Sequence, residues 1–269
     1  MKNRHLAGLL LLSLSLWCVA PGAYTASVSD RARERNWADQ IVDFVVVGEP
    51  VWLETSGVKF LALYTFPENE AAGPSKGLIL MHGRGVHPAW GFIDSLRMDL
   101  ANMGWHTLSV QMPVLARDAP AAGYGKTFPE AFARIDAGIR YLRQREVSTL
   151  FLLGHSLGAT MGIAYLADHP QATVDGMVAI GVGTVAGGTM HQHPARMLEK
   201  IQKSVLDIYG SDDLPIVLDY ADARREAARK ARNQRYLQIR EPDTDHFFTD
   251  KYDTLRDRIY GWLRDTTTK

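Results

Sequence analysis

The stretch Thr149-Leu150-Phe151-Leu152-Leu153-Gly154-His155-Ser156-Leu157-Gly158 decides the fold of this chain. Its first five residues are an apolar run typical of a buried strand, and the run from Ala159 to Ala167 has the composition of a helix. Between them lies the motif G-x-S-x-G, in which a sharp strand-to-helix turn places a serine at its apex. The two glycines remove side chains where strand and helix come close together. The segment therefore predicts a strand, a turn that exposes the Ser156 hydroxyl above a sheet, and a helix.

Segments on both sides of this motif alternate between short apolar strands and helices. Such alternation predicts parallel β-α-β units with helices on both faces of one sheet. We find no internal repeat, linker or second domain, so the predicted fold class is α/β with one mostly parallel sheet. Strands are predicted at Val42–Val47, Val58–Phe66, Gly77–Met81, Trp105–Met112, Val174–Val182, Val205–Tyr209 and Tyr236–Ile239, and helices at Ser29–Val42, Phe92–Met103, Pro129–Arg145, Pro194–Gln202, Leu218–Arg232 and Tyr252–Leu263.

The first 26 residues differ from the rest and have the pattern of a secretory signal peptide. A basic start precedes an apolar run of about 15 residues, which is short for a bilayer span. The predicted organisation is a signal peptide over residues 1–26 and a single domain over residues 27–269. This implies a periplasmic or secreted protein. An uncleaved anchor is the alternative, and the cleavage point stays open between Ala20 and Ser27.

The composition excludes several classes of protein. Apolar residues make up 46% of the chain and charged residues 22%, as in ordinary soluble proteins. Lys and Arg together number 30, and so do Asp and Glu together. The chain therefore has no net positive charge that would attract nucleic acid or an anionic membrane surface. Loss of the leader with Lys2 and Arg4 takes the formal charge from 0 to 0 − 2 = −2. The only cysteine, Cys18, lies in the leader and follows Trp17, which disfavours lipidation, so we expect a mature chain without disulfides.

Three side chains that follow predicted strands have the chemistry to act together. Ser156 follows one strand, Asp213 or its neighbour Asp212 follows another, and His246 lies after the last. Because ligands bind at the carboxyl ends of strands in α/β sheets, we expect these groups at one edge. A serine hydroxyl needs a base within reach, and the base needs an acid to fix its tautomer. The pattern therefore predicts a Ser-Asp-His triad, with Asp212 as the alternative acid.

In this order of motifs the chain resembles the α/β-hydrolase superfamily from Val58 to Leu263. The resemblance rests on His82-Gly83-x-Gly85, G-x-S-x-G, Gly210-x-x-Asp213 and Asp245-His246. It implies an α/β-hydrolase fold and favours Asp213 as the triad acid. It also implies an oxyanion hole built from the backbone amides of Leu157 and Arg84, with Gly83 or Gly85 as alternatives for the second donor. Within the superfamily the chain is similar to small periplasmic hydrolase-like proteins of Gram-negative bacteria, whose role is uncharacterised.

The predicted function is that of a secreted serine hydrolase that cleaves a carboxylic ester or thioester through an acyl-enzyme. The segment between Val182 and Ser204, where this superfamily often inserts a lid, is short, which indicates a minimal lid and a small-molecule or surface-presented acyl substrate. Two alternatives stay open: a binding or scaffold protein that has lost turnover on the same fold, and a small peptidase. We expect no cofactor, no nucleic-acid partner and no membrane span after leader removal. The sequence leaves the oligomeric state undetermined.

Four residues have two interpretations each: Arg84 in the predicted oxyanion loop (His82-Gly83-Arg84-Gly85), Trp90 and Phe92 after it, and Tyr124 in the later Gly-rich loop. Trp90, Phe92 and Tyr124 either line an acyl pocket or belong to the core. The Arg84 side chain either holds an anionic group of the substrate or forms a surface ion pair. The sequence alone does not choose between these interpretations, because each depends on which residues are neighbours in space.

The remaining histidines are interpreted as structural. His82 is expected to brace the oxyanion loop, and His155 to pack beside the serine turn. His191 and His193 alternate as H-x-H, which is found in metal sites, but no acidic or cysteine ligand lies nearby in sequence. We therefore expect no metal ion in this protein.

Overall fold

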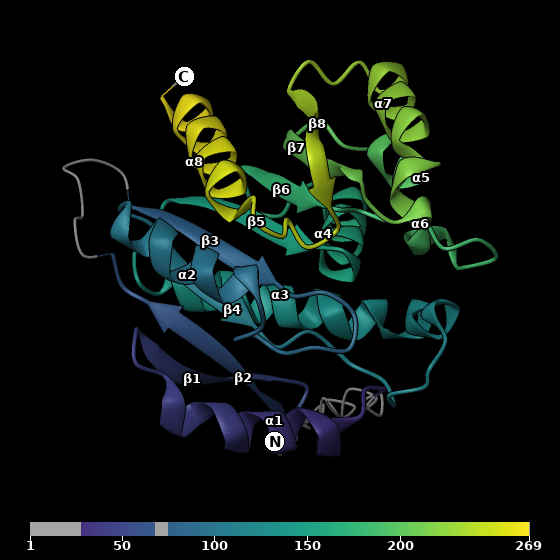
Figure 1. Ribbon diagram of the computed structural model, residues 1–269. Helices are drawn as coiled ribbons and strands as arrows, with labels where there is room; N and C mark the ends of the chain where they lie inside the picture. The colour runs from purple at the N-terminus through teal and green to yellow at the C-terminus, as the bar shows by residue number, and fades with distance from the viewer. Residues whose placement is uncertain (1–27, 68–74, 269) are drawn as a thin grey trace, which may run out of the picture.

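The computed structural model describes residues 28–67 and 75–268, in which eight strands form one sheet (Figure 1). The predicted signal peptide lies outside the described residues. The strand order is β1-β2-β4-β3-β5-β6-β7-β8. Only the β1–β2 and β2–β4 pairs are antiparallel among the described strands, which confirms the mostly parallel sheet. The strands are β1 (Glu49–Thr55), β2 (Val58–Thr65), β3 (Lys76–Met81), β4 (His106–Val110), β5 (Thr149–His155), β6 (Gly176–Ile180), β7 (Ser204–Asp212) and β8 (Tyr236–Asp245).

Helices cover both faces of this sheet. In β3, Leu78 and Leu80 belong to the core under α2 and α8, whereas Ile79 and Met81 belong to the core under α3 and α4. This division follows from the pleat, because successive side chains of a strand point to opposite faces. The helices are α1 (Arg31–Ile41), α2 (Phe92–Asn102), α3 (Phe128–Arg143), α4 (Leu157–Asp168), α5 (Pro194–Leu198), α6 (Pro215–Leu218), α7 (Ala221–Lys230) and α8 (Tyr252–Thr267), with 3₁₀-helices η1 (Val42–Phe44), η2 (Ala121–Thr127) and η3 (Met190–Gln192).

The segment before the sheet differs from its prediction. The valine-rich run 42–47 is not a strand: it begins with η1, and Val46 is 92% exposed. The chain turns at Gly48, where φ is +79° and a Cβ atom would lie 2.2 Å from the Tyr64 carbonyl oxygen. Pairing with β2 therefore begins only at Glu49. β-Branched residues do not form a strand where no neighbouring strand is within hydrogen-bonding reach.

The last two strands extend beyond their predicted ends, to Asp212 in β7 and Asp245 in β8. Their pairing continues through a register shift between Gly210 and Asp212. Glycine is required there, since a Cβ atom on Gly210 would lie 2.0 Å from the Thr244 carbonyl oxygen. The added residues of β8 are mostly polar, so the apolar pattern stops before the strand does. The extension places Asp213 and His246 directly after two paired strand ends.

The segment between β6 and β7 contains only η3 and the five-residue helix α5. Its buried residues Met197 and Leu198 join the core shared by α3 and α4. The predicted helix over 218–232 corresponds to α7, which begins only at Ala221, while Leu218 is the last residue of the separate short helix α6. In the part of the chain that the structure covers, no helix is both long enough and apolar enough to cross a membrane.

Candidate active site

Ser156 occupies the tight turn between β5 and α4. Its backbone has φ 53° and ψ −116°, a conformation that L-residues adopt only under constraint, and its N–H donates to the Ile180 carbonyl at 2.8 Å. The motif glycines make the turn possible. A Cβ atom on Gly154 would lie 2.6 Å from the Ala159 nitrogen, and one on Gly158 would lie 2.4 Å from the Met81 carbonyl oxygen. These contacts are the physical reason for both glycines, because neither position has room for a side chain.

His246 and Asp213 form a hydrogen-bonded pair. The distance from His246 Nδ1 to Asp213 Oδ1 is 2.6 Å, and both residues are buried, at 5% and 4% exposure. Asp213 Oδ1 also accepts the Leu214 N–H at 2.7 Å, which orients the carboxylate. The carboxylate can only accept, so Nδ1 carries the proton and Nε2 is left as the basic nitrogen. Asp212, in contrast, is exposed, and its carboxylate accepts from the Ser211 hydroxyl.

The carboxyl end of β6 connects this pair to the serine turn. The Ile180 carbonyl holds the Ser156 N–H, and a Cβ atom on the next residue, Gly181, would lie 3.0 Å from the His246 ring. The rings of His155 and His246 lie 4.7 Å apart, and His155 Nε2 is 3.1 Å from the His246 carbonyl oxygen. His155 therefore donates to that carbonyl. The structure brings Ser156, Asp213 and His246 to one edge of the sheet, after β5, β7 and β8.

The loop after β3 lies against the same turn. A Cβ atom on Gly83 would lie 3.2 Å from His155 Nδ1 and 3.5 Å from the Ser156 Cβ atom. Leu157 is the first residue of α4, so its N–H has no carbonyl partner one turn earlier in the helix. The two amides expected to form an oxyanion hole, those of Leu157 and Arg84, therefore belong to segments that meet beside Ser156.

His82 fixes the orientation of the Arg84 amide. His82 Nε2 accepts the Met112 N–H at 2.9 Å, so the ring proton is on Nδ1, which donates to the Gly83 carbonyl at 2.8 Å. That carbonyl shares its peptide with the Arg84 N–H, and in a trans peptide the two groups point in opposite directions. Burial lowers the pKa of His82 to about 3, so the ring is neutral at ordinary pH. His82 thus aims the Arg84 N–H away from itself.

The loop after β3 is also held by a residue of α1, the helix that lies beside β1 and β2 (Figure 1). Arg33 Nη2 donates to the Gly85 carbonyl at 3.0 Å, and Nη1 donates to the Leu115 carbonyl at 2.8 Å. Its guanidinium lies 4.5 Å from the centre of the Trp37 ring. No local sequence pattern marks Arg33, because its partners are 52 and 82 positions away. Arg33 holds the oxyanion loop from outside the sheet.

The aromatic candidates divide into core and surface. Phe92 is buried with its ring 4.8 Å from that of His155, and Tyr124 is buried with its hydroxyl accepting the Leu115 N–H. Trp90 is partly exposed, and its ring lies 5.7 Å from that of Phe247, the residue after His246. Two of the three aromatic side chains therefore pack in the protein interior, and only Trp90 reaches the surface near the site.

The Arg84 side chain and the H-x-H histidines have separate surroundings. Arg84 is exposed and forms no ion pair within residues 28–67 and 75–268. His191 is bonded to Asp168 at 2.7 Å rather than to His193. Within the same ranges, no group of three or more His, Cys, Asp or Glu side chains is arranged to hold a metal ion. Because Arg84 is exposed and unpaired in the described ranges, its guanidinium is available to a bound molecule.

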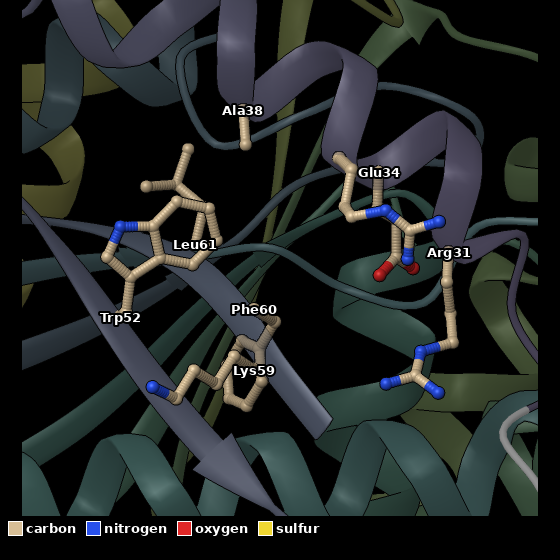
Figure 2. A pocket seen from close by; sticks show the side chains of 8 residues that line it. Arg31, Glu34, Ala38, Trp52, Lys59, Phe60 and Leu61 are labelled. Carbon is tan, nitrogen blue, oxygen red and sulfur yellow. The ribbon is translucent and has the colours of Figure 1, made fainter. Parts of the chain in front are cut away.

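A small cavity lies between α1 and strands β1 and β2 (Figure 2). Its volume of about 20 Å³ is enough for roughly one water molecule and not for a substrate. We therefore assign it no part in the reaction. It is lined by Arg31, Glu34, Arg35, Ala38, Trp52, Lys59, Phe60 and Leu61.

Comparison with known proteins identifies both a family and a fold. The family model described as "Protein of unknown function (DUF3530)" matches residues 9–131 and 126–265. No match is found among curated proteins. Est1E from Butyrivibrio proteoclasticus is 15% identical, with 82% of this chain and 99% of that chain covered and a TM-score of 0.67.

Two further solved structures have the same fold. XC6422 from Xanthomonas campestris, described as an α/β serine hydrolase without lid, is 19% identical, with 82% and 96% of the two chains covered and a TM-score of 0.61. A dienelactone hydrolase from Anabaena variabilis is 16% identical, with 80% and 96% covered and a TM-score of 0.61. At these identities the likeness shows the fold, which is that of the α/β-hydrolases.

Proposed function

The chain belongs to the family described as "Protein of unknown function (DUF3530)", and from the geometry of its own residues we propose that it is a serine hydrolase. The observation that carries the proposal is the 2.6 Å bond between His246 and Asp213, which lies beside the strained turn of Ser156. Ser156 attacks the carbonyl carbon of an ester or thioester. His246 takes the hydroxyl proton on Nε2, and Asp213 stabilises the imidazolium that forms.

The carbonyl oxygen gains negative charge in this step, and backbone amides stabilise it. We assign this role to the N–H groups of Leu157 and Arg84, the first at the start of α4 and the second oriented by His82. Collapse of the tetrahedral intermediate transfers the proton from His246 to the leaving group. Water then repeats the sequence on the acyl-enzyme, which releases the acid and restores Ser156.

An ester or thioester is the proposed substrate bond because its leaving group needs less assistance than an amine. Fold relatives include a protein named as an esterase, from Pyrococcus furiosus, and one named as a dienelactone hydrolase, and these names support the proposal by analogy. The short segment between β6 and β7 favours an open site, as in the fold relative described as having no lid.

We further propose that the protein is exported, on the basis of the basic and apolar pattern of its first 26 residues. Amino-terminal sequencing of the protein recovered from the periplasm or culture medium tests this. A mature chain that starts between Ala20 and Ser27 supports export, and a full-length chain held in the cytoplasm contradicts it.

Covalent labelling tests the hydrolase proposal directly. A fluorophosphonate should label the exported protein at Ser156, and Ser156→Ala should abolish both the label and hydrolysis across a panel of p-nitrophenyl esters. A protein that takes no label and behaves like Ser156→Ala in every assay would instead be a binding protein on a hydrolase fold. Labelling without turnover of any ester or thioester would redirect the search to amides.

A further inference from the structure

Exposed apolar side chains gather beside the proposed catalytic pair. Within residues 28–67 and 75–268, three of the large hydrophobic residues left exposed follow Asp213 or His246 within three positions. They are Leu214 at 42%, Ile216 at 43% and Phe247 at 48% exposure. Single exposed hydrophobic residues are ordinary, but a group of them around one polar site is typical of a ligand-binding surface.

The exposure of Phe247 is imposed by a rigid turn. The Asp245 carboxylate accepts the N–H groups of Phe247 at 3.0 Å and of Thr249 at 2.9 Å. The next residue, Phe248, has φ 53° and is buried at 1% exposure in the core under α2 and α8. Because one phenylalanine anchors the turn and the carboxylate closes it, the Phe247 ring is held outward and cannot relax into the core.

Trp90 extends this surface to the oxyanion loop. Its ring meets that of Phe247 at 5.7 Å in an edge-to-face arrangement, and Phe247 lies 5.9 Å from the His155 ring. The aromatic pair therefore joins the segment that carries the proposed oxyanion donor to the segment that carries His246.

Ile216 borders the site from the side of α4. The N–H of Thr184 donates to its carbonyl at 2.9 Å, and its Cδ1 atom lies 3.0 Å from where Gly183 would carry a Cβ atom. The Gly183 carbonyl in turn accepts from the hydroxyl of Thr160, in the first turn of the helix that follows Ser156. Ile216 is thus connected to the first turn of α4 through Gly183, which is beside Ile216 and is bonded to Thr160.

From this arrangement we propose that the substrate is an ester with an extended apolar group, which binds on Trp90, Phe247, Leu214 and Ile216. The inference rests on the proposed function. A polar or compact substrate would leave these four side chains in water in the complex, whereas a hydrocarbon group covers them. Full burial of one methylene group is worth about fourfold in affinity, and on an open surface about twofold is expected.

Two ester series measure the preference. In the first, p-nitrophenyl esters carry acyl groups from acetate to decanoate; in the second, acetate esters carry alcohols of increasing chain length. The wild-type protein should gain about tenfold or more in kcat/KM from two to six carbons in one of the two series. The series that responds identifies whether the acyl or the alcohol part lies on the apolar surface.

Variants then locate the preference. Phe247→Ser and Ile216→Ser should lower kcat/KM for the six-carbon substrate by about fivefold to tenfold more than for the two-carbon substrate. Leu237→Ser is the matched control. Leu237 is 46% exposed on β8, the strand that precedes His246 and Phe247, and it lies near the amino end of that strand. The control should retain the chain-length preference of the wild-type protein.

The possible failures are distinguishable. Absence of fluorophosphonate labelling at Ser156 would remove the proposed function and with it this inference. Labelling and turnover with flat chain-length profiles in both series would overturn the inference alone. A preference that Phe247→Ser and Ile216→Ser leave intact would also overturn it. Thermal unfolding of each variant identifies any loss caused by misfolding, which solvent-exposed positions such as these should not produce.

Discussion

Strand β7 and the residue directly after it provide two buried carboxylates with different partners. Asp207, in the middle of the strand, accepts from Arg224 at 2.8 Å, Tyr236 at 2.7 Å and Gln238 at 3.0 Å, and the Arg224–Asp207 pair is fully buried. Asp213, just past the end of the strand, is bonded to His246. Each carboxylate keeps one buried oxygen without a protein partner in the described part of the chain.

The two regions differ in the side chain that is bonded to the carboxylate and in the position of the pair along the strand. An arginine is always charged, so the pair in mid-strand is a permanent structural contact. A histidine can gain and lose a proton, and at the edge of the sheet that proton can be exchanged with a substrate. Burial of a carboxylate therefore does not by itself mark a candidate catalytic residue; the titratable partner at the strand end is what supports the role proposed for Asp213.

The largest effect is expected for Asp213→Asn. An amide in place of the carboxylate no longer fixes the tautomer of His246, and kcat/KM should fall by about 10⁴-fold. Steady-state hydrolysis of p-nitrophenyl esters measures this. The adjacent and exposed Asp212→Asn is the control and should retain full activity. Equal losses in the two variants would contradict the assignment of the acid.

Substitution of the mid-strand carboxylate, Asp207, should instead lower the stability of the protein and leave its chemistry intact. Asp207→Ala leaves the Arg224 guanidinium buried without its counter-charge, and the free energy of unfolding should fall by about 3–5 kcal/mol. Urea unfolding measures this loss, and the fraction that stays folded should still hydrolyse esters. The control is Asp222→Ala, which removes an exposed ion pair with Arg225 on α7 and should leave the urea midpoint unchanged. An Asp207→Ala protein of full stability would end the structural interpretation.

Substitution of Arg33 tests whether its contacts from α1 only stabilise the fold or also position the loop that carries the proposed oxyanion donor. Arg33→Ala frees the Gly85 and Leu115 carbonyls, and displacement of the oxyanion loop should lower kcat by about tenfold to a hundredfold with little change in KM. Affinity for an alkyl boronic acid, which mimics the oxyanion, should weaken in parallel. The exposed Arg35→Ala on the same helix is the control. A parallel rise in KM, with boronate affinity preserved, would assign Arg33 to substrate binding instead.

A pH-dependent effect is expected from the buried histidines beside the site. The pKa values of His82 and His155 are lowered to about 3, chiefly by burial, while the unfolded chain titrates near 6.5. Between these values the unfolded state binds more protons, so the free energy of unfolding should decrease as pH falls, by about 1.4 kcal/mol per pH unit for each ring.

Urea unfolding between pH 4 and pH 7.5 measures this slope. His155→Gln keeps a donor toward the His246 carbonyl but removes the titrating group, so its slope should be smaller by that of one ring. An unchanged slope in His155→Gln would show that acid instability arises from other groups.

Several tertiary features had recognisable sequence signals. The serine turn follows from its two glycines, because the close approach of strand and helix is a requirement between near neighbours in sequence. The order of Ser156, Asp213 and His246 after separate strands also predicted which groups meet at one edge. The apolar pattern failed where β8 becomes polar, and it failed in the run 42–47, where valines lack a strand to pair with.

The amino-acid sequence by itself determined the α/β layering, the turn at Ser156 and the short list of residues able to act with it, since these depend on local spacing and composition. Only the tertiary structure placed Asp213 rather than Asp212 against His246, and only it joined Arg33 to the oxyanion loop. Both outcomes depend on the angle and register at which distant segments pack. Such a geometry is fixed by the whole sheet and core, and no stretch of sequence records it alone.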